Sequence, residues 1–459
     1  MYPNDTIAAI STALGESAIG IVRLSGSESV HIANKIFKGA NLEKVASHTL
    51  NYGHIVNPDN NHVVDEVMVG VMLAPRSYTT EDSVEINCHG GIVAIQRVLE
   101  LVLAQGARMA EPGEFTQRAF LNGRIDLSQA EAVMDLIQSR TRKAMDASLS
   151  QLNGSLKRKI QQLRHEMLQT LAQVEVTIDY PEYDDVEELS LSEMNQTAHS
   201  VKQQIQAILE QAQHGRIFRD GIKTAIVGRP NVGKSSLMNR LSGSEKAIVT
   251  NIEGTTRDTI EEFVNIRGVP LQLIDTAGIR ETDEIVEQIG VEKSRQAMER
   301  ADLIILMING SEPLTDMDRE LLALTQHHTR VILLNKNDLA TAIDAKDLTA
   351  FADESEIIAT SLLTEAGIDE LEAKIEDNFF QGQIKSNDVN YMLNTRHIEL
   401  LRQALETLDE VIESTELELP VDLIQIDFTH AWDLLGEIIG ENVQDELLNK
   451  LFSQFCLGK

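Results

Sequence analysis

A run of eight residues near the middle of the chain has the composition of a phosphate-binding loop. It reads Gly228-Arg-Pro-Asn-Val-Gly-Lys-Ser235, which fits the pattern G-x-x-x-x-G-K-S. Glycines permit a tight loop whose backbone N–H groups surround phosphate oxygens, and the helix that follows offers its positive N-terminus. Lys234 can reach the β- and γ-phosphates of a nucleotide, and the hydroxyl of Ser235 can bind Mg²⁺. The run therefore predicts a nucleoside triphosphate site.

Three further motifs follow in the order typical of a GTP-binding domain. Gly254-Thr-Thr-Arg-Asp258 has the composition of a switch segment, in which Thr256 can complete the shell of the magnesium ion. Asp275-Thr-Ala-Gly278 offers a carboxylate that can hold Mg²⁺ through water and an N–H group that can sense the γ-phosphate. Asn335-Lys-Asn-Asp338 offers a carboxylate that can accept the N1–H and N2–H groups of guanine, which adenine lacks. Together the four motifs predict an enzyme that binds and hydrolyses GTP.

The expected GTP contacts come from these motifs and from the residues just before the switch threonine. They are Gly228, Asn231, Val232, Gly233, Lys234, Ser235, Ser236, Thr250, Asn251, Ile252, Glu253, Gly254, Thr255, Thr256, Asp275, Thr276, Ala277, Gly278, Asn335, Lys336 and Asp338. Ile279, the residue after Gly278, stands where many small GTPases carry a glutamine that orients the attacking water. Hydrolysis therefore needs another group to position water and a cation to offset transition-state charge, a role that an arginine finger fills elsewhere with a gain of roughly 10³–10⁵ in rate.

Apolar strands separated by helical periods must position these motifs. The expected strands are Lys223–Val227, Leu271–Ile274, Leu303–Ile308 and Val331–Leu334, and a helix at Ser236–Leu241 follows the first of them. Apolar strands alternating with helix-length polar segments are typical of a mainly parallel α/β sheet. Residues 216–380 are therefore expected to form a P-loop G domain of the Ras-like type.

The rest of the chain predicts two further domains. Residues 1–120 mix β-rich runs and helical periods, as in a small α/β domain, with strands at Ile19–Leu24, Val67–Leu73 and Ser83–Cys88 and a helix at Val93–Gln105. Residues 121–215 and 381–459 have helical periodicity and flank the G domain on both sides. The expected fold is multidomain, α/β plus all-α, with one helical domain interrupted by the inserted G domain.

Two charged stretches stand out in the first helical part. An apolar stripe from Leu152 to Ile178 predicts a long helix that ends at Pro181, and the acidic run at positions 182–188 is then expected to be a solvated loop. Positions 139–164 hold seven Lys and Arg residues and one acid, Asp146. This basic stretch is either a solvated helix face or a contact for RNA or a partner.

Composition restricts the compartment and the partners. The 459-residue chain has 40 basic and 72 acidic residues, which give a net charge of −32. Its surface should therefore repel the phosphate backbones of nucleic acids unless a basic patch or a partner supplies the attraction. Its two cysteines, Cys88 and Cys456, exclude a disulfide framework and favour a reducing cytosol. The N-terminus lacks the features of a signal peptide, and Leu303–Ile308 is far shorter than the about 20 residues of a membrane span. A cytoplasmic protein with no membrane span is expected.

The segments GRPNVGKSS, IVTNIEGTTRD, DTAGIRETDEIVEQIG and NKND resemble the G domain of the MnmE (TrmE) family of tRNA-modification GTPases, in the TrmE-Era-Septin-like superfamily. The N-terminal runs GIVRLSG, EINCHGG and PGEFTQRAFLNGRIDL and the terminus Cys456-Leu-Gly-Lys459 resemble the same family. The resemblance extends over essentially the whole chain. A prenylation box is a competing interpretation of Cys456, but the residues after it do not suit that signal.

For the G domain, the resemblance implies a potassium ion in place of an arginine finger. The matching ligand positions are Asn231, Thr250, Ile252 and Thr255, and the family's water-orienting glutamate matches Glu287. The resemblance also ties hydrolysis to the face-to-face meeting of two G domains. The expected catalytic residues are then Glu287 and Lys234 for hydrolysis and Cys456 for tRNA modification.

For the N-terminal domain, the resemblance implies homodimerisation and binding of a tetrahydrofolate derivative, in its 5-formyl or 5,10-methylene form. The matching folate contacts are Arg23, Glu85, Arg124 and Lys459. The family acts with the flavoprotein MnmG (GidA), in a heterotetramer-type complex, to add a carboxymethylaminomethyl-type group to C5 of the wobble uridine of certain tRNAs.

The chain departs from the family's usual residues at two places, and two other functions are alternative interpretations. The family often has lysine where this chain has Arg124, and Ser361-Leu362-Leu363 replaces the more common Ser-Ala-Lys beside guanine. A ribosome-assembly GTPase would share the G motifs, but it would normally carry a basic RNA-binding module outside the G domain. A scaffold that binds GTP without turnover is disfavoured by the intact Lys234, Thr256 and Asp275.

Overall fold

The computed structural model describes residues 5–139, 141–179, 184–242, 262–274, 298–380, 391 and 393–458. The chain divides into two compact units. One unit comprises Met1–Met134, Leu156–Ala198 and Gln403–Lys459, and the other comprises Asp135–Ser155 and His199–Arg402.

The first unit contains an N-terminal seven-stranded sheet with strand order β3-β4-β5-β6-β2-β1-β7. Its neighbours are antiparallel except for β1 and β7. The elements are β1 (Ile7–Ile10), β2 (Ser17–Ser25), α1 (Ser29–Ile36), β3 (Phe37–Lys38), the 3₁₀ turn η1 (Leu42–Lys44), β4 (Thr49–Val56), β5 (Val63–Met72), β6 (Ser83–Gly90), α2 (Ile92–Ala104), β7 (Arg108–Met109) and α3 (Glu114–Leu121). The predicted runs at positions 19–24, 67–73, 83–88 and 93–105 thus correspond to β2, β5, β6 and α2.

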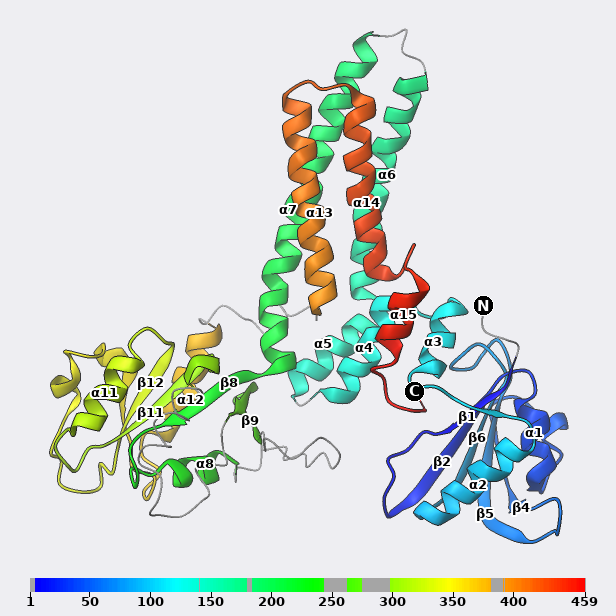
Figure 1. Cartoon of the computed structure of the whole chain (residues 1–459), viewed down its shortest axis with the longest axis horizontal. Helices are drawn as coiled ribbons and strands as arrows, with labels where there is room; N and C mark the ends of the chain where they lie inside the picture. Colours follow the sequence, from blue (N-terminus) through cyan, green and yellow to red (C-terminus); the bar gives the residue numbers. More distant parts are fainter. Residues whose placement is uncertain are drawn as a thin grey trace. The chain divides into compact units, whose positions relative to one another are not determined.

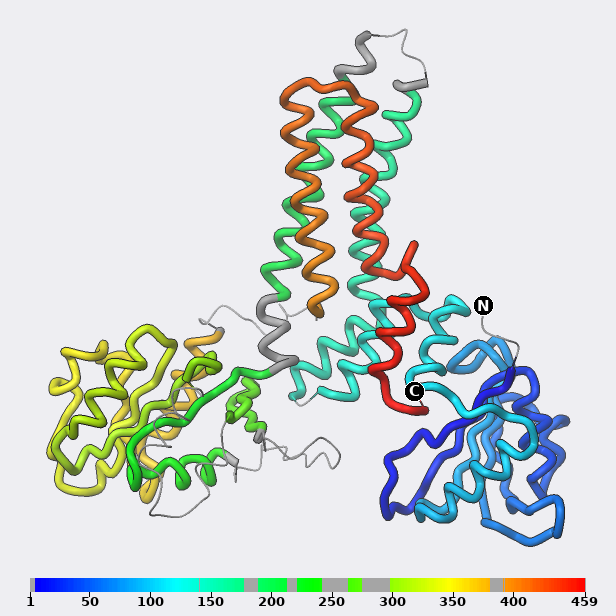
Figure 2. Tube along the Cα trace, in the orientation of Figure 1, coloured from blue at the N-terminus to red at the C-terminus, as the bar shows by residue number. Residues whose placement is uncertain are grey.

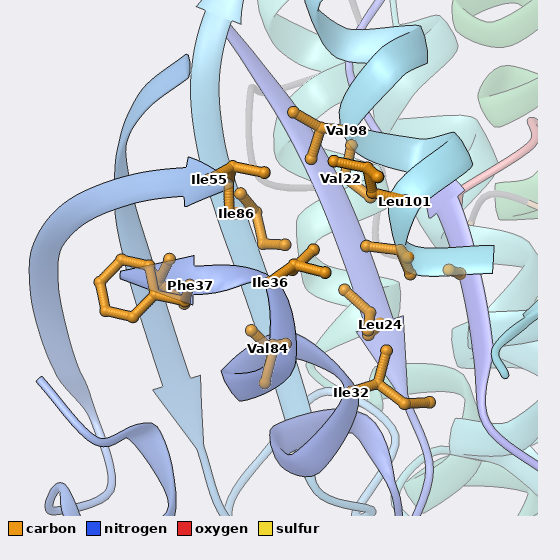
Figure 3. Packing of buried hydrophobic residues seen from close by; sticks show 14 of the residues in the cluster. Val22, Leu24, Ile32, Ile36, Phe37, Ile55, Val84, Ile86, Val98 and Leu101 are labelled. Carbon is orange, nitrogen blue, oxygen red and sulfur yellow. The ribbon is translucent and has the colours of Figure 1, made fainter. Parts of the chain in front are cut away.

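One face of this sheet packs against α1 and α2 (Figure 1). Figure 3 shows Val22 and Leu24 of β2 beside Val84 and Ile86 of β6, with Ile36 of α1 in the same cluster. Successive side chains of a strand point to opposite faces. The residues between these, including Arg23 and Glu85, therefore lie on the face away from the helices.

Helices of the first unit come from distant parts of the sequence. Their bounds are α4 (Leu127–Gln138), α6 (Ser155–Asp179), α7 (Asp184–Asp220), α13 (Thr395–Glu416), α14 (Val421–Ile439) and α15 (Asp445–Phe452), of which α4, α6, α7 and α13 have residues in the second unit as well. Hydrogen bonds join α6 to α7 (Thr170 to Thr197, 2.8 Å) and α7 to α13 (Asn195 to Thr415, 2.7 Å). The indole of Trp432 in α14 donates to a backbone carbonyl of α6 at 3.0 Å. The two helical segments predicted on either side of the G domain therefore pack together (Figure 1).

The predicted long helix is present, but its start differs from the prediction. A turn with Gly154 in the left-handed region (φ 81°) separates α6 from α5 (Arg142–Leu152). The apolar stripe of α6 is buried, as expected, at Leu156, Ile160, Leu163, Met167 and Val174.

The expectation for the acidic run is wrong, and that for the basic stretch fails at one of its seven basic residues, Arg164. Positions 184–188 of the acidic run belong to the start of α7 and not to a loop, and acidic residues are common there because the helix dipole favours negative charge at its N-terminus. Arg164, counted with the basic stretch, is neither solvated nor available to RNA, since it is 6% exposed. Its guanidinium lies over the ring of Trp432 and pairs with Glu441.

The second unit contains the expected α/β sheet, with strand order β13-β12-β11-β8-β10-β9. All of its neighbours are parallel except β9 and β10. The elements are β8 (Ile222–Val227), α8 (Lys234–Ser242), β9 (Glu262–Ile266), β10 (Val269–Leu273), β11 (Leu303–Asn309), α11 (Asp316–Leu324), β12 (Arg330–Asn335), the 3₁₀ turns η2 (Ala345–Leu348) and η3 (Glu354–Glu356), β13 (Ile357–Ala359) and α12 (Ile368–Phe380).

The central strands of this sheet are buried on both faces. Every residue of β11 and β12 is buried, and alternate residues belong to two separate apolar clusters. This explains their continuous apolar sequence, which differs from the alternation of a half-exposed strand. In the part of the chain that the structure describes, no helix is long and apolar enough to cross a membrane.

Candidate functional site

The phosphate-binding loop connects β8 to α8 and requires glycine at two positions. Gly228 has φ 153°, and a Cβ atom there would lie 2.5 Å from the carbonyl oxygen of Met307. Gly233 has φ 111°, and its Cβ would lie 2.4 Å from Nδ2 of Asn335. Both contacts are too close for a side chain. The α-helix begins at Lys234, so the loop presents the helix N-terminus as the sequence predicted.

Lys234 is a half-buried cation without an acidic partner among the described residues. Its Nζ donates to the carbonyl oxygens of Gly228 at 2.6 Å and Arg229 at 2.8 Å. Burial lowers the pKa of its ammonium group, because desolvation disfavours the charged form. An anion placed in the loop would compensate that desolvation. The loop and this ammonium group therefore fit the phosphates of a nucleotide.

The guanine-side motif is fastened to the phosphate-binding loop. Asn335 ends β12, and its Nδ2 donates to the carbonyl oxygen of Val232 at 2.7 Å across 103 residues of sequence. The hydroxyl of Ser361 donates to Oδ1 of Asp338 at 2.6 Å, which orients the carboxylate expected to read guanine. The backbone N–H of Leu362 donates to Oδ1 of Asn335 at 3.4 Å. Ser361 and Leu362 therefore contact the motif, although leucine is unusual at this position.

Several expected site residues lie outside the described residues. They are Thr250, Asn251, Ile252, Glu253, Gly254, Thr255, Thr256, Asp275, Thr276, Ala277, Gly278, Glu287 and Lys459. The strand that leads to Asp275 is described: β10 pairs in parallel with β8, and the N–H of Ile274 donates to the carbonyl of Thr224 at 3.1 Å. The strand before this motif thus adjoins the strand before the phosphate-binding loop.

A second cluster of candidate residues lies at the face of the N-terminal sheet that is turned away from α1 and α2. Arg23 of β2 stands opposite Glu85 of β6, and its Nε donates to Oε1 of Glu85 at 2.9 Å. The guanidinium carbon of Arg124 lies 4.5 Å from the ring centre of Tyr78, and that of Arg23 lies 5.7 Å from the same ring. Tyr78, which the sequence analysis did not single out, lies beside both arginines, so three of the four expected folate contacts form one cluster.

The C-terminal tail reaches this cluster, although it is 435 residues from Arg23 in sequence (Figure 2). The carbonyl oxygen of Gly458 accepts hydrogen bonds from Nη1 of Arg23 and from the hydroxyl of Ser11, both at 3.1 Å. Gly458 has φ 86°, and a Cβ there would lie 2.4 Å from the carbonyl oxygen of Ile10. The carbonyl of Cys456 accepts from the N–H of Gly113 at 3.3 Å.

The environments of the last residues differ. Phe452 is 1% exposed in an apolar cluster, and Phe455 packs against the same cluster. Cys456 is exposed and has no disulfide partner. Packing alone therefore accounts for the two phenylalanines but not for the exposed thiol.

A buried ion network, which the sequence analysis missed, stabilises α3 near this cluster. Glu114 is fully buried and accepts from Arg108 at 2.6 Å and from Arg118 at 2.9 Å. Arg118 also pairs with Asp5 at 2.6 Å. Burial raises the pKa of Glu114, but the hydrogen bonds from Arg108, from the N–H of Glu111 and from Arg118 outweigh that effect and lower it. The network connects the N-terminal segment to the helix before Arg124.

Comparisons with known proteins agree with this arrangement. The family model "GTP-binding protein TrmE N-terminus" matches residues 6–124, and "MnmE helical domain" matches residues 127–456. The tRNA modification GTPase MnmE of Enterococcus faecalis is 61% identical over 457 residues, which are 99% of this chain and 98% of the relative. This chain belongs to the MnmE family. As an MnmE protein it is a GTPase with mixed α/β and helical domains.

Other relatives extend the comparison. MnmE of Oceanobacillus iheyensis is 55% identical over 459 residues and covers all of both chains. Among solved structures, the G domain of the FeoB iron transporter of T. maritima matches 34% of this chain and 97% of its own, with 27% identity and a TM-score of 0.26.

Proposed function

We propose that this MnmE protein is a potassium-dependent GTPase that modifies C5 of the wobble uridine of certain tRNAs. It acts in the cytoplasm as a homodimer with the flavoprotein MnmG, uses a tetrahydrofolate derivative as the one-carbon donor, and installs a carboxymethylaminomethyl-type group. The relatives' name supports GTP hydrolysis and tRNA modification together.

The contact between the C-terminal tail and the Arg23–Glu85 pair carries the folate part of the proposal. A folate has a hydrogen-bonding pterin and an anionic glutamate tail, so it needs a carboxylate, cations and a flat apolar surface. Glu85, Arg23 and Arg124 supply the charges, and the ring of Tyr78 supplies a surface on which a planar ring can stack. The exposed thiol of Cys456 is two residues from the Gly458 carbonyl that Arg23 binds. This juxtaposition suits chemistry on a bound one-carbon unit.

In the G domain, the sequence offers oxygen ligands of the kind that Mg²⁺ and K⁺ bind. Ser235 and Thr256 would hold Mg²⁺, which neutralises phosphate charge when bound. Asn231, with φ 63°, is exposed in the loop and has a neutral amide oxygen of the kind that an alkali cation binds. Thr250, Ile252 and Thr255 would complete the potassium site. Lys234 stabilises charge on the β- and γ-phosphates, and Glu287 orients the attacking water that Ile279 cannot hold.

Charge supports the need for a partner. With a net charge of −32, the chain offers phosphate backbones little attraction outside local patches. A tRNA-binding flavoprotein partner such as MnmG would supply that attraction and the flavin chemistry.

Mass spectrometry of wobble uridines from a strain that lacks this protein tests the tRNA part. The C5 group should be absent and should return with the intact gene. GTP turnover in matched potassium and sodium buffers tests the ion, with Asn231→Ala as the variant. Equal rates in the two buffers, or full potassium stimulation of the variant, would contradict the potassium proposal and leave tRNA modification untouched.

A further inference from the structure

The second residue of the phosphate-binding loop carries a side chain that makes its own set of contacts. The Nη2 of Arg229 donates to Oε2 of Glu312, and its Nε lies 3.5 Å from Oδ2 of Asp318. The Arg229 side chain is 19% exposed. It is thus hydrogen-bonded to Glu312 and in a longer ion pair with Asp318, and both carboxylates lie more than 80 residues away in the sequence.

Asp318 is a rigid anchor for this arginine. It is the third residue of α11, and its Oδ2 accepts from the N–H of Thr315 at 3.0 Å and from the Thr315 hydroxyl at 2.7 Å. Its side chain is 2% exposed. Because these bonds form the N-terminal cap of α11, the carboxylate cannot follow Arg229 if the loop shifts.

Glu312 connects the same arginine to the guanine side of the site. It lies in the segment after β11, where the N–H of Gly310 donates to the carbonyl of Asn335 at 2.8 Å. The hydrogen bond from Arg229 lowers the pKa of Glu312, and the charge of Lys336, the next residue of the guanine motif, lowers it further. Glu312 therefore has one cation from each nucleotide-binding loop near it.

The backbone of Arg229 contacts the phosphate-binding lysine directly. Its carbonyl oxygen accepts from Nζ of Lys234 at 2.8 Å. Pro230 follows it and restricts the backbone of Arg229 to extended conformations. Holding the guanidinium therefore also holds the carbonyl that contacts the ammonium group.

We propose that Arg229 is a positioning residue, which fixes the phosphate-binding loop through Glu312 and Asp318 and couples it to the guanine-binding loop. It acts through the loop backbone and its neighbours, and Lys234 remains the group that meets the phosphates. A loop that is already in its binding shape loses less conformational freedom when the ligand binds. Arg229 therefore raises the affinity for GDP and GTP alike and has little influence on the chemical step.

Equilibrium binding of fluorescent GDP and GTP analogues to the full-length protein tests this role. Arg229→Ala should weaken both nucleotides about tenfold and raise KM while kcat stays within about twofold, the pattern of lost uniform binding. Arg229→Lys keeps the charge but not the fork that meets two carboxylates, so it should restore only part of the affinity. The matched control is Arg240→Ala, which removes an ion pair with Glu365 (2.8 Å) in the same unit and should leave nucleotide affinity unchanged.

A double-substitution cycle separates positioning from general destabilisation. Glu312 is 52% exposed and outside the helix cap, so Glu312→Gln should fold normally and weaken GDP binding about threefold. When Glu312→Gln is combined with Arg229→Ala, it should weaken GDP binding little further, because both substitutions remove the same Arg229–Glu312 interaction. Wild-type GDP affinity in Glu312→Gln or in Arg229→Ala would overturn the proposal, as would fully additive losses. If Arg229→Ala does not fold, Arg229→Lys and Glu312→Gln decide the outcome.

Discussion

Replacing Gly458 by alanine should detach the C-terminal tail from the N-terminal sheet. Gly458 has φ 86°, and the added Cβ would lie 2.4 Å from the carbonyl oxygen of Ile10 and 2.8 Å from Cα of Ser11. Both neighbours are backbone atoms of the segment that continues from β1, so they cannot rotate away as the end of a side chain can. The tail must move instead.

The expected loss follows from the hydrogen bonds that the moved tail gives up. If the tail stayed docked, the left-handed conformation would cost an L-residue about 1–2 kcal/mol, in addition to the collision. Movement relieves that strain, but the carbonyl then loses a hydrogen bond from the charged Arg23, worth about 1.5–3 kcal/mol, and one from the neutral Ser11 hydroxyl, worth about 1 kcal/mol. The expected loss is therefore about 2.5–4 kcal/mol, since these values already include rehydration of the freed groups. About 3 kcal/mol would reduce the docked population by roughly 100-fold.

Carboxypeptidase digestion followed by intact-mass measurement reports tail docking directly. After Lys459 is removed, the residues at positions 458 and 457 should be released much faster from Gly458→Ala than from the wild type. Phe452 stays buried, so digestion should stop near the end of α15. Isothermal titration with 5-formyltetrahydrofolate on the same samples should show weaker binding, while GTP turnover should not change.

Gly106→Ala is the matched control. Gly106 also has positive φ (110°), but nothing lies within 4 Å of its added Cβ. This variant has backbone strain without the collision and should keep the tail docked. Wild-type digestion rates in Gly458→Ala would refute the reasoning about the tail, and unchanged folate affinity in a chain with a released tail would refute its role in folate binding.

Three other outcomes are expected. Glu287→Ala should lower kcat strongly with GTP affinity near normal, and a large loss of affinity with intact chemistry would instead assign that residue to binding. Cys456→Ser should fold and hydrolyse GTP normally but fail to modify wobble uridine, and normal modification would exclude a chemical role for the thiol. Glu114→Gln should lower the free energy of unfolding by about 3 kcal/mol at neutral pH, because it removes the charge that pairs with the buried Arg118. Since the folded-state pKa of Glu114 is lowered, its stabilisation is present above its ordinary pKa of 4.5 and is lost as the pH falls below it, so thermal melts of wild type and variant should converge in acid.

The phosphate-binding loop could be predicted from sequence because consecutive residues build it. Gly228, Gly233 and Lys234 act through local backbone geometry, and the apolar strands around them need only the parallel α/β arrangement. The buried stripe of α6 was predictable for the same reason, since helical spacing places its residues on one face.

Predictions from local sequence composition were wrong where residues distant in the sequence determine whether a side chain is buried, and where a helix begins inside a charged run. Arg164 lies in a basic stretch, yet the ring of Trp432 and the carboxylate of Glu441 accommodate it inside the helical domain. The acidic run after Pro181 has the composition of a loop, yet α7 begins within it at Asp184.

The sequence by itself determined the GTP-binding motifs and their order. Its resemblance to the MnmE family implied that Arg23, Glu85 and Arg124 contact folate. Only the tertiary structure decided that these three residues form a cluster, because the antiparallel register of β2 and β6 sets Arg23 opposite Glu85. The docking of Gly458 beside them likewise depends on contacts between opposite ends of the chain. No local pattern encodes such contacts, since they form only when the helical domain returns the C-terminus to the N-terminal sheet.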